Sequence, residues 1–346
     1  MKEVKLVYLH ESGISQEDYI SFLKSYYNKK SFERHFKRDL WYSKWGPKHI
    51  LLALYDNEIV GQSCVYRVQA MLRGQSIEWW WGVDAFVIEK SRGLGIGKKL
   101  QKKLADDHPN VSSACYSRIN GIVKRKIGQT PFCEVAFGFY PCSRFFSVAI
   151  ELLYYKILKK RVNVPIRIPN FYYYLRSIGK SNLNNYNITE TQLDCNVNDF
   201  IDNSLSKRYD FYIVRDQKYL DWKYKQNPTL KYSRLFIKSE SRVEAIVMLS
   251  KPFYTEFIIS KVKAVNLLDY FITPESNLKL DDIIHLVMRY HKDRGSVIDG
   301  IKAIGTTGGW LRFIYPYPSV PLLSSHDGEK PKSSYIAYSD QDMEQM

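Results

Sequence analysis

The chain has 346 residues, of which 45% are hydrophobic and 25% charged, so it can form one large domain or two smaller ones, each with a buried core. Its formal net charge of +15 favours an anionic partner, either nucleic acid, anionic lipid or a phosphorylated small molecule, without choosing among them. Five cysteines without C-x-x-C spacing argue against a metal or disulfide framework, and the absence of any apolar run of about 18 residues argues against a membrane-spanning segment. We expect a reduced, cytoplasmic protein.

The first part of the chain predicts a sheet with one early helix. Residues 3–9 alternate as a strand, and Ser15 is placed to cap a helix with Asp18 reaching back to it. Residues 50–55 and 59–69 are two strand-like runs joined by a short polar turn, which indicates a hairpin. A third run, residues 77–88, includes three consecutive tryptophans at 79–81.

A glycine-rich loop follows this third strand and leads into a basic helix. Gly93, Gly95 and Gly97 alternate with Leu94 and Ile96, and Lys98 comes next. A glycine turn at a helix N-terminus exposes unpaired N–H groups and the positive end of the helix dipole, which suits a phosphate. The spacing fits neither the P-loop nor the dinucleotide fingerprint, which needs G-x-G-x-x-G.

The full pattern resembles the acyl-CoA signature of the GNAT N-acyltransferase family. The residues that carry the resemblance are Val87, Arg92, Gly93, Gly95 and Gly97, while Glu89 stands where the family usually has proline. The resemblance implies an α/β fold with a mixed, mostly antiparallel sheet flanked by helices, and an acyl-CoA such as acetyl-CoA as co-substrate with no metal. It implies that the loop holds the pyrophosphate and that the end of the preceding strand pairs with the pantetheine; these cofactor-binding residues are Phe86, Val87, Ile88, Arg92, Gly93, Leu94, Gly95, Ile96, Gly97 and Lys98.

The segment beyond the basic helix predicts a strand at 111–116, a helix at 119–127 ended by Gly128, and a strand at 132–140. In the family two strands splay here and the thioester lies between them. A tyrosine that protonates the departing thiolate is common four residues before this glycine, but this chain has Lys124 there. The candidates for the chemistry are therefore Asp84 as general base, with Tyr116 or Tyr140 as acid.

Residues 145–158 form an apolar stretch that ends in Lys159-Lys160-Arg161. Such a stretch suits a helix on a membrane surface or a helix buried between domains, and we expect the buried one. Prolines and a polar run place a linker at 161–189.

The later half repeats the earlier one. Trp41 and Trp222 each stand six residues before a proline, a second hairpin follows, and Asp269 parallels Asp84. We expect a tandem GNAT duplication with an acyl-CoA-binding domain at 1–160, a degenerate acceptor-side domain at 190–323 and a disordered tail at 324–346. In the second copy the glycines are replaced, and Asp281 and Asp282 stand where a pyrophosphate would lie, so this copy should not bind CoA.

The sequence therefore predicts an acyl-CoA-dependent N-acyltransferase, most simply an N-acetyltransferase, acting by direct transfer to a small cytoplasmic amine. The resemblance to tandem-type relatives, together with the basic surface, suggests a nucleotide-linked amino sugar as acceptor, and we do not expect a nucleic-acid partner. The alternatives are a Fem-like aminoacyl or peptidyl transferase for cell-wall precursors, and a non-catalytic module that senses CoA or binds nucleic acid. The oligomeric state is left open.

Overall fold

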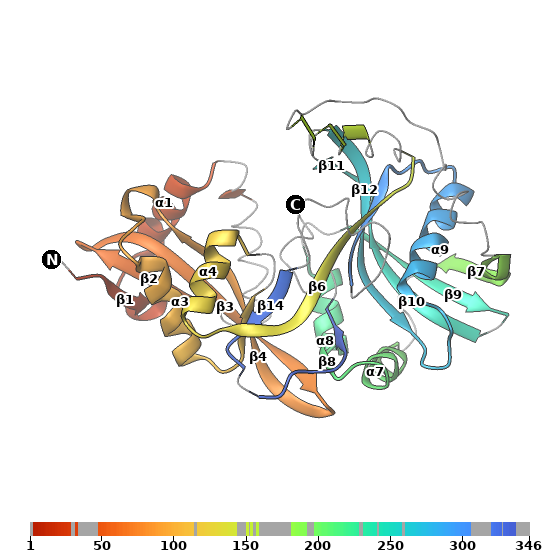
Figure 1. Cartoon of the computed structure of the whole chain (residues 1–346), viewed down its shortest axis with the longest axis horizontal. Coiled ribbons are helices and arrows are strands. Elements are labelled where there is room, and N and C mark those ends of the chain that lie inside the picture. Colours follow the sequence, from red (N-terminus) through yellow and green to blue (C-terminus); the bar gives the residue numbers. More distant parts are fainter. Residues whose placement is uncertain are drawn as a thin grey trace. The chain divides into compact units, whose positions relative to one another are not determined.

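A computed structural model describes the chain in two compact units whose segments alternate along the sequence. The first unit consists of Met1–Glu134, Lys218–Pro228 and Pro321–Lys332, and the second of Val135–Gln217, Thr229–Val320 and Ser333–Met346. The described residues are 3–28, 32–33, 48–113, 116–143, 150–151, 153–154, 157–158, 181–191, 197–227, 231–240, 242–257, 260–305, 320–326 and 328–336. Figure 1 traces the elements of both units.

The sheet of the first unit has the strand order β1-β2-β3-β4-β5-β14. The strands and helices of this unit are β1 Lys5–Tyr8, η1 Leu9–Glu11, α1 Gln16–Tyr26, β2 His49–Tyr55, β3 Glu58–Leu72, β4 Gln75–Val87, η2 Glu89–Ser91, α3 Ile96–Asp107, β5 Val111–Ser113, α4 Arg118–Lys126, η4 Asp221–Lys225 and β14 Val320–Ser324. The predicted hairpin is confirmed, and its turn places Asp56 and Asn57 at positive φ, as a tight β-turn between twisted strands requires. The cap of α1 is also confirmed, because the Ser15 hydroxyl accepts the backbone N–H of Asp18.

Alternation along the strands gives this sheet two apolar faces, each covered by a helix. On one face Leu100 and Leu104 of α3 pack with Leu51 and Trp80. On the other, Phe22 and Leu23 of α1 pack with Leu52 and Leu54. The three tryptophans of β4 are all buried.

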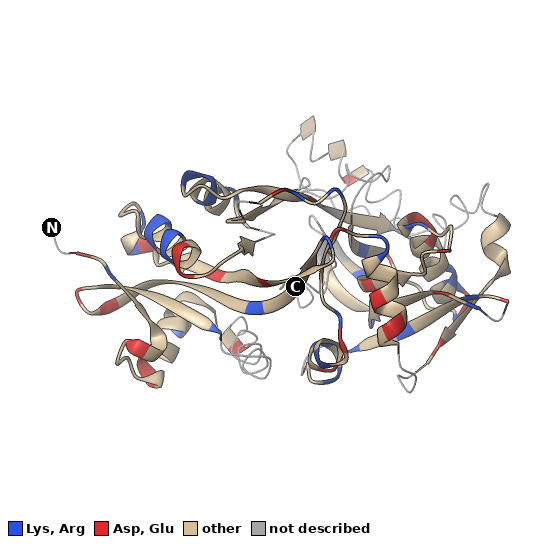
Figure 2. Ribbon diagram, turned by 90° about the horizontal axis from the view of Figure 1, so that it is seen from below, with Lys and Arg blue, Asp and Glu red and all other residues tan. Residues whose placement is uncertain are grey.

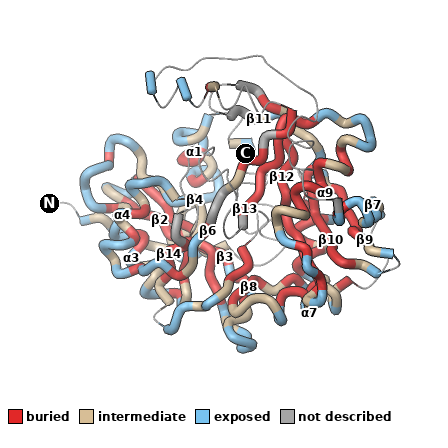
Figure 3. Tube along the Cα trace, turned by 45° about the vertical axis from the view of Figure 1, so that its right-hand side comes forward, coloured by how far each residue is buried: buried red, intermediate tan, exposed pale blue. Residues whose placement is uncertain are grey.

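The second unit contains a sheet of order β6-β13-β12-β10-β9-β7, with β11 paired to β12. Its elements are β6 Thr130–Pro141, η3 Ser181–Asn185, β7 Tyr186–Glu190, α7 Asn198–Ser206, β8 Phe211–Ile213, α8 Gln217–Leu220, β9 Tyr232–Ser239, β10 Arg242–Ser250, β11 Phe253–Phe257, β12 Ser260–Ile272, α9 Leu280–Asp293, β13 Gly300–Gly305 and β15 Ser334–Tyr335. The first residues of β6 and most of α8 belong to the first unit. The strands β10 and β12 and the helix α9 form most of its buried core (Figure 3).

The second unit repeats the order of elements found in the first. In both, a hairpin is followed by a long antiparallel strand, a helix and a short strand parallel to the long one: β2, β3, β4, α3 and β5 in the first, β9, β10, β12, α9 and β13 in the second. Both long strands carry an irregularity in register near the matched aspartates, Asp84 in β4 and Asp269 in β12. The chain is thus an α/β protein with two sheets flanked by helices. The domain limits expected at 160 and 190 remain a prediction.

Two expectations for particular segments were wrong. In the stretch 145–158 the side chains of Leu153, Tyr154, Ile157 and Leu158 are exposed rather than buried between domains. In the tail, residues of β14 and β15 pair with strands, and Tyr335 is only 2% exposed, because Tyr335 fills the core of the second unit. The Trp41 match lies outside the described residues.

Candidate active site

The glycine loop connects β4 to α3 in the first unit. Residues Glu89–Ser91 form one tight turn, and the Arg92 backbone N–H donates to the Glu89 carbonyl at 3.1 Å. The Arg92 side chain folds back, and its Nε donates to the Val87 carbonyl at 3.2 Å. Gly93 and Gly95 then have φ of +89° and +72°, in the left-handed region where a side chain is costly. Glycine is therefore the favoured residue at both positions.

The N-terminus of α3 is open. Gly95 caps the helix without any side-chain hydrogen bond, and the N–H of Lys99 makes the first backbone bond, to the Gly95 carbonyl at 3.2 Å. Within the described part of the chain, no acceptor lies against the amides of residues 93–98. A Cβ built on Gly93 or Gly95 meets no atom within 4 Å. The loop thus leaves a cradle of N–H groups with room for an anion.

The charge around the cradle comes from fewer residues than the sequence suggests. Arg92, Lys98 and Lys99 are exposed beside it. Lys102 and Lys103 were also expected to face the loop, but they form ion pairs one turn further along the helix, with Asp106 at 3.0 Å and Asp107 at 2.9 Å. The Lys and Arg positions on the helices of this unit are blue in Figure 2.

The strands β4 and β5 are paired only briefly. Their parallel register comprises Trp80 with Val111 and Trp81 with Ser112, whereas β4 continues to Val87. Of the expected pantetheine-pairing residues, Phe86 stacks on Tyr26 with ring centroids 3.7 Å apart, and the Ile88 N–H donates to the Val60 carbonyl at 3.0 Å. Val87 packs against the core beneath α3.

Asp84 lies in β4 with φ of +49° and is engaged by a cation. The Lys48 ammonium donates to its carboxylate at 2.7 Å, and the two side chains are 6% and 8% exposed. Asp269 in the second unit has a comparable partner, the Arg215 guanidinium at 3.3 Å, and accepts the Tyr335 hydroxyl at 3.0 Å. Both matched aspartates are therefore held in buried ion pairs.

The two candidate tyrosines belong to different units. Tyr116 lies in the first, its ring so close to α4 that a Cβ on Gly121 would stand 2.6 Å from it. Tyr140 lies in β6 of the second unit, opposite Ile301 and folded over Gly138. Their roles as acids remain predictions.

Comparisons with known proteins bear on this loop and fold. Residues 16–125 match the model of the acetyltransferase (GNAT) family, and this range contains the whole loop and the helices on either side of it. Residues 16–125 are thus similar to this family of acetyltransferases. A comparison with curated protein sequences found no match.

Solved structures share this GNAT fold at low sequence identity. A probable N-acyltransferase from Enterococcus faecalis matches with a TM-score of 0.53 and 14% identity, covering 94% of this chain and 72% of that one. A GCN5-related N-acetyltransferase from Anabaena variabilis gives 0.55 and 10%, covering 93% and 72%. N-myristoyltransferase from Saccharomyces cerevisiae, solved with myristoyl-CoA and inhibitors, gives 0.51 and 8%, covering 100% and 85%.

Lys124 stands four residues before Gly128, and its setting was not evident from the sequence. The residue is 1% exposed, and its ammonium donates to the Gln101 carbonyl oxygen at 2.7 Å. The Gln101 amide in turn donates to the Ser63 hydroxyl at 2.8 Å. Burial lowers the pKa of Lys124 to about 7. Ser117, where asparagine is common in the family, caps α4 by accepting the Asn120 N–H.

The second GNAT-like half closes the corresponding helix end. The Asp282 carboxylate accepts the Lys279 N–H at 3.0 Å, and the N–H groups of Asp282 and Ile283 both donate to the Lys279 carbonyl. These amides are already used and two carboxylates stand in the first turn of α9, so this end is unsuited to a pyrophosphate.

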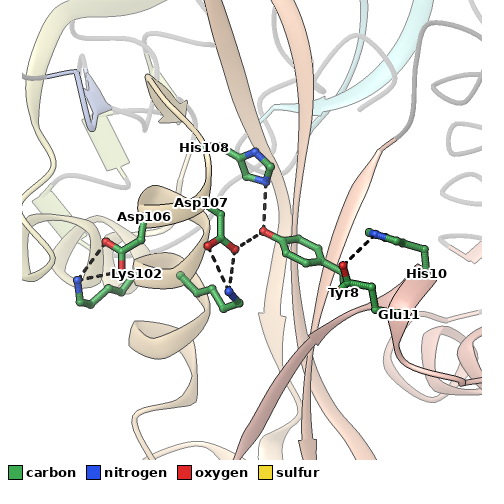
Figure 4. A network of polar contacts seen from close by, with 8 residues as sticks. Tyr8, His10, Glu11, Lys102, Asp106, Asp107 and His108 are labelled. Carbon is green, nitrogen blue, oxygen red and sulfur yellow. Dashed lines mark hydrogen bonds and ion pairs between the residues drawn. The ribbon is translucent and has the colours of Figure 1, made fainter.

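A polar cluster marks the other end of α3 (Figure 4). The Tyr8 hydroxyl donates to Asp107 at 2.6 Å and lies 3.2 Å from His108 Nε2. His49 is beside it, with ring centroids 4.9 Å from both His108 and Trp80. Burial lowers the pKa of both histidines below 6.5; the charge of His10 lowers that of His49 further, and the charge of His49 lowers that of His108. Among the described residues no group of three or more His, Cys, Asp or Glu side chains has the arrangement of a metal site.

Proposed function

We propose that the chain is an acyl-CoA-dependent N-acyltransferase whose loop at residues 92–98 binds the pyrophosphate of the thioester carrier. The observation that carries the proposal is the start of α3, where Gly95 caps the helix without a side-chain hydrogen bond and a Cβ on Gly93 or Gly95 would meet no atom within 4 Å. Arg92, Lys98 and Lys99 add charge without obstructing the amides. Residues 86–88, beyond the pairing of β4 with β5, are the proposed edge for the pantetheine arm, although the Val87 carbonyl accepts the Arg92 side chain and the Ile88 N–H donates to Val60.

The proposed reaction is transfer of the acyl group from CoA to the acceptor amine. The acceptor amine attacks the thioester carbonyl, a C–N bond forms and the C–S bond breaks. The amine loses one proton to a base, and the departing thiolate gains one to leave as free CoA. Asp84 is the proposed base, and Tyr116 or Tyr140 the proposed acid. The acceptor is proposed to be a small amine such as a nucleotide-linked amino sugar, which the net charge of +15 favours.

The test is the change Gly95→Asp, which places a carboxylate in the cradle at a position where aspartate tolerates the left-handed backbone. We expect acetyl-CoA affinity, measured by calorimetry, to fall on the order of 100-fold. The matched control is Gly74→Asp in the hairpin turn of β3 and β4, where φ is +76° and a Cβ meets no atom within 4 Å. Equal affinity in Gly95→Asp and the wild type would refute the site.

A thiol-release assay over a panel of amines then separates an enzyme from a CoA sensor. Release of free CoA that depends on the amine supports the transferase. Tight acetyl-CoA binding without release of free CoA in the presence of any of the amines supports the CoA sensor instead.

A further inference from the structure

The parallel strand pair of the second unit carries two buried polar side chains. Asn266 of β12 and Lys302 of β13 are direct partners in the register, and they are 0% and 5% exposed. Directly paired residues lie on the same face of a sheet. The corresponding strands of the first unit, β4 and β5, have no unpaired polar side chain among their paired residues. Trp80, Trp81 and Val111 are buried apolar residues, and the Ser112 hydroxyl accepts a hydrogen bond from the Trp79 indole N–H at 2.6 Å.

Lys302 extends across β12 towards β11. Its ammonium donates to the Thr255 hydroxyl at 3.1 Å and lies 5.8 Å from the centre of the Phe253 ring. Burial alone lowers its pKa to about 8. The carboxylate of Asp299, the residue just before β13, accepts hydrogen bonds from the Ser143 hydroxyl and the Lys263 N–H. The cation is therefore buried without a carboxylate among the contacts described for it.

Asn266 leaves both polar atoms of its side chain unused. Its backbone N–H donates to the Ser250 hydroxyl at 2.8 Å, but neither Nδ2 nor Oδ1 has a partner among the described residues. An unpaired buried amide costs about 1–3 kcal/mol per group, and native proteins rarely leave one without a ligand or water.

We propose that Asn266 and Lys302 bind a small oxyanion, a carboxylate or phosphate, that also carries a hydroxyl or amine. The Lys302 ammonium and the Asn266 amide N–H donate to the oxyanion, and the Asn266 carbonyl oxygen accepts from the hydroxyl or amine. The anion supplies the counter-charge that the buried lysine lacks. Thr255 and Phe253 are partly exposed, so the rim of the site is accessible on the β11 side. This site lies within the second unit and goes beyond the acyl-CoA loop.

Calorimetry without acyl-CoA tests the site with five probes: lactate, serine, glycerol 3-phosphate, acetate and inorganic phosphate. We expect probes that combine an oxyanion with a hydroxyl or amine to bind at least about tenfold more tightly than acetate or phosphate. Preference for lactate and serine identifies a carboxylate ligand, and preference for glycerol 3-phosphate identifies a phosphate ester. Lys302→Met and Asn266→Leu should each weaken binding about tenfold or more. Lys263→Met, which removes a lysine from the opposite face of β12, should not.

A measurement on the wild-type protein covers the case in which the variants fold poorly. The ¹³Cε resonance of Lys302, assigned with Lys302→Arg, reports its protonation, and a bound oxyanion should move its titration to higher pH. Failure of every probe to bind, or to shift this titration, overturns the proposal and leaves water as the partner of Asn266. Because no acyl-CoA is present, that result leaves the proposed transferase untouched.

Discussion

Lys124 is a lysine buried where its charge is poorly solvated. Its pKa of about 7, against 10.5 in an exposed side chain, means that the unfolded chain binds more protons than the folded one between these values. The free energy of unfolding therefore rises with pH from about 7 to 10.5, since deprotonation removes the cost of burial.

We expect Lys124→Met to raise the free energy of unfolding at pH 7 by about 2 kcal/mol. Removal of the buried charge contributes roughly 4 kcal/mol, and the unpaired Gln101 carbonyl oxygen offsets about half of it. Urea denaturation at pH 7 and pH 9.5 measures the change. A variant that is no more stable than the wild type and keeps its pH dependence contradicts the buried-cation account.

Variants of the Lys48–Asp84 ion pair can show whether Asp84 stabilises the fold, takes part in the reaction, or does both. Asp84→Asn removes the carboxylate charge that faces the buried Lys48 ammonium, and we expect a loss of about 3 kcal/mol in the free energy of unfolding. The double change Lys48→Met with Asp84→Leu should restore most of that stability.

The double variant also tests Asp84 as general base. If Asp84 accepts the amine proton, kcat at saturating acetyl-CoA stays at least about tenfold below wild type although the fold has recovered. A stable double variant with unchanged kcat assigns Asp84 to structure alone, as the Arg215 ion pair does for Asp269 in the second unit.

At the level of elements, the histidines at the C-terminal end of α3 make the stability of the fold depend on pH. The pKa values of His49 and His108 lie below 6.5, first because burial disfavours the charged ring, while Asp107 and Glu78 oppose that effect for His108. The folded state thus binds fewer protons than the unfolded state just below pH 6.5. Stability is fully present above that pH and is lost as the pH falls through the folded pKa values.

We expect the urea midpoint of the wild type to fall between pH 7 and pH 5.5, and His49→Phe to reduce that fall. The substitution keeps a ring against Trp80 and removes one titrating group. Equal pH dependence in the two proteins contradicts the assignment.

The elements that the sequence predicted are those specified locally. The glycine loop, the cap at Ser15 and the hairpin at Asp56 depend on residues within a few positions of one another, and each is found where expected. What the sequence did not predict depends on distant residues. The contact of Lys48 with Asp84 spans 36 positions, and that of Tyr335 with Asp269 spans 66. The sequence pattern also gives no sign that Lys124 is buried, because its burial depends on how the fold packs around it.

At the level of the whole molecule, the last residues are structural members of both units. Leu323 and Ser324 pair with β5 in the first unit, whereas Ser334 and Tyr335 pair with β8 in the second. Tyr335 also donates to Asp269 and accepts the Tyr270 N–H at 3.0 Å.

Truncation after Ser319 should therefore destabilise both units, although a disordered tail would tolerate it. We expect loss of cooperative thermal unfolding, because the first sheet loses β14, β8 loses its partner β15, and Asp269 loses a buried partner. Truncation after Tyr338 is the matched control and should leave the melting temperature within about 2 °C of the full chain. Equal melting temperatures for the two truncations would contradict this role of the C-terminal strands.

The alternation of the two units along the chain has a consequence for biosynthesis. Met1–Glu134 emerges from the ribosome first, but the strand that pairs with β5 is translated only after residue 319. The first unit therefore stays incomplete, with an exposed strand edge at β5, until β14 has been translated. Nascent chains arrested before that point should be more sensitive to protease within residues 1–134 than the released protein.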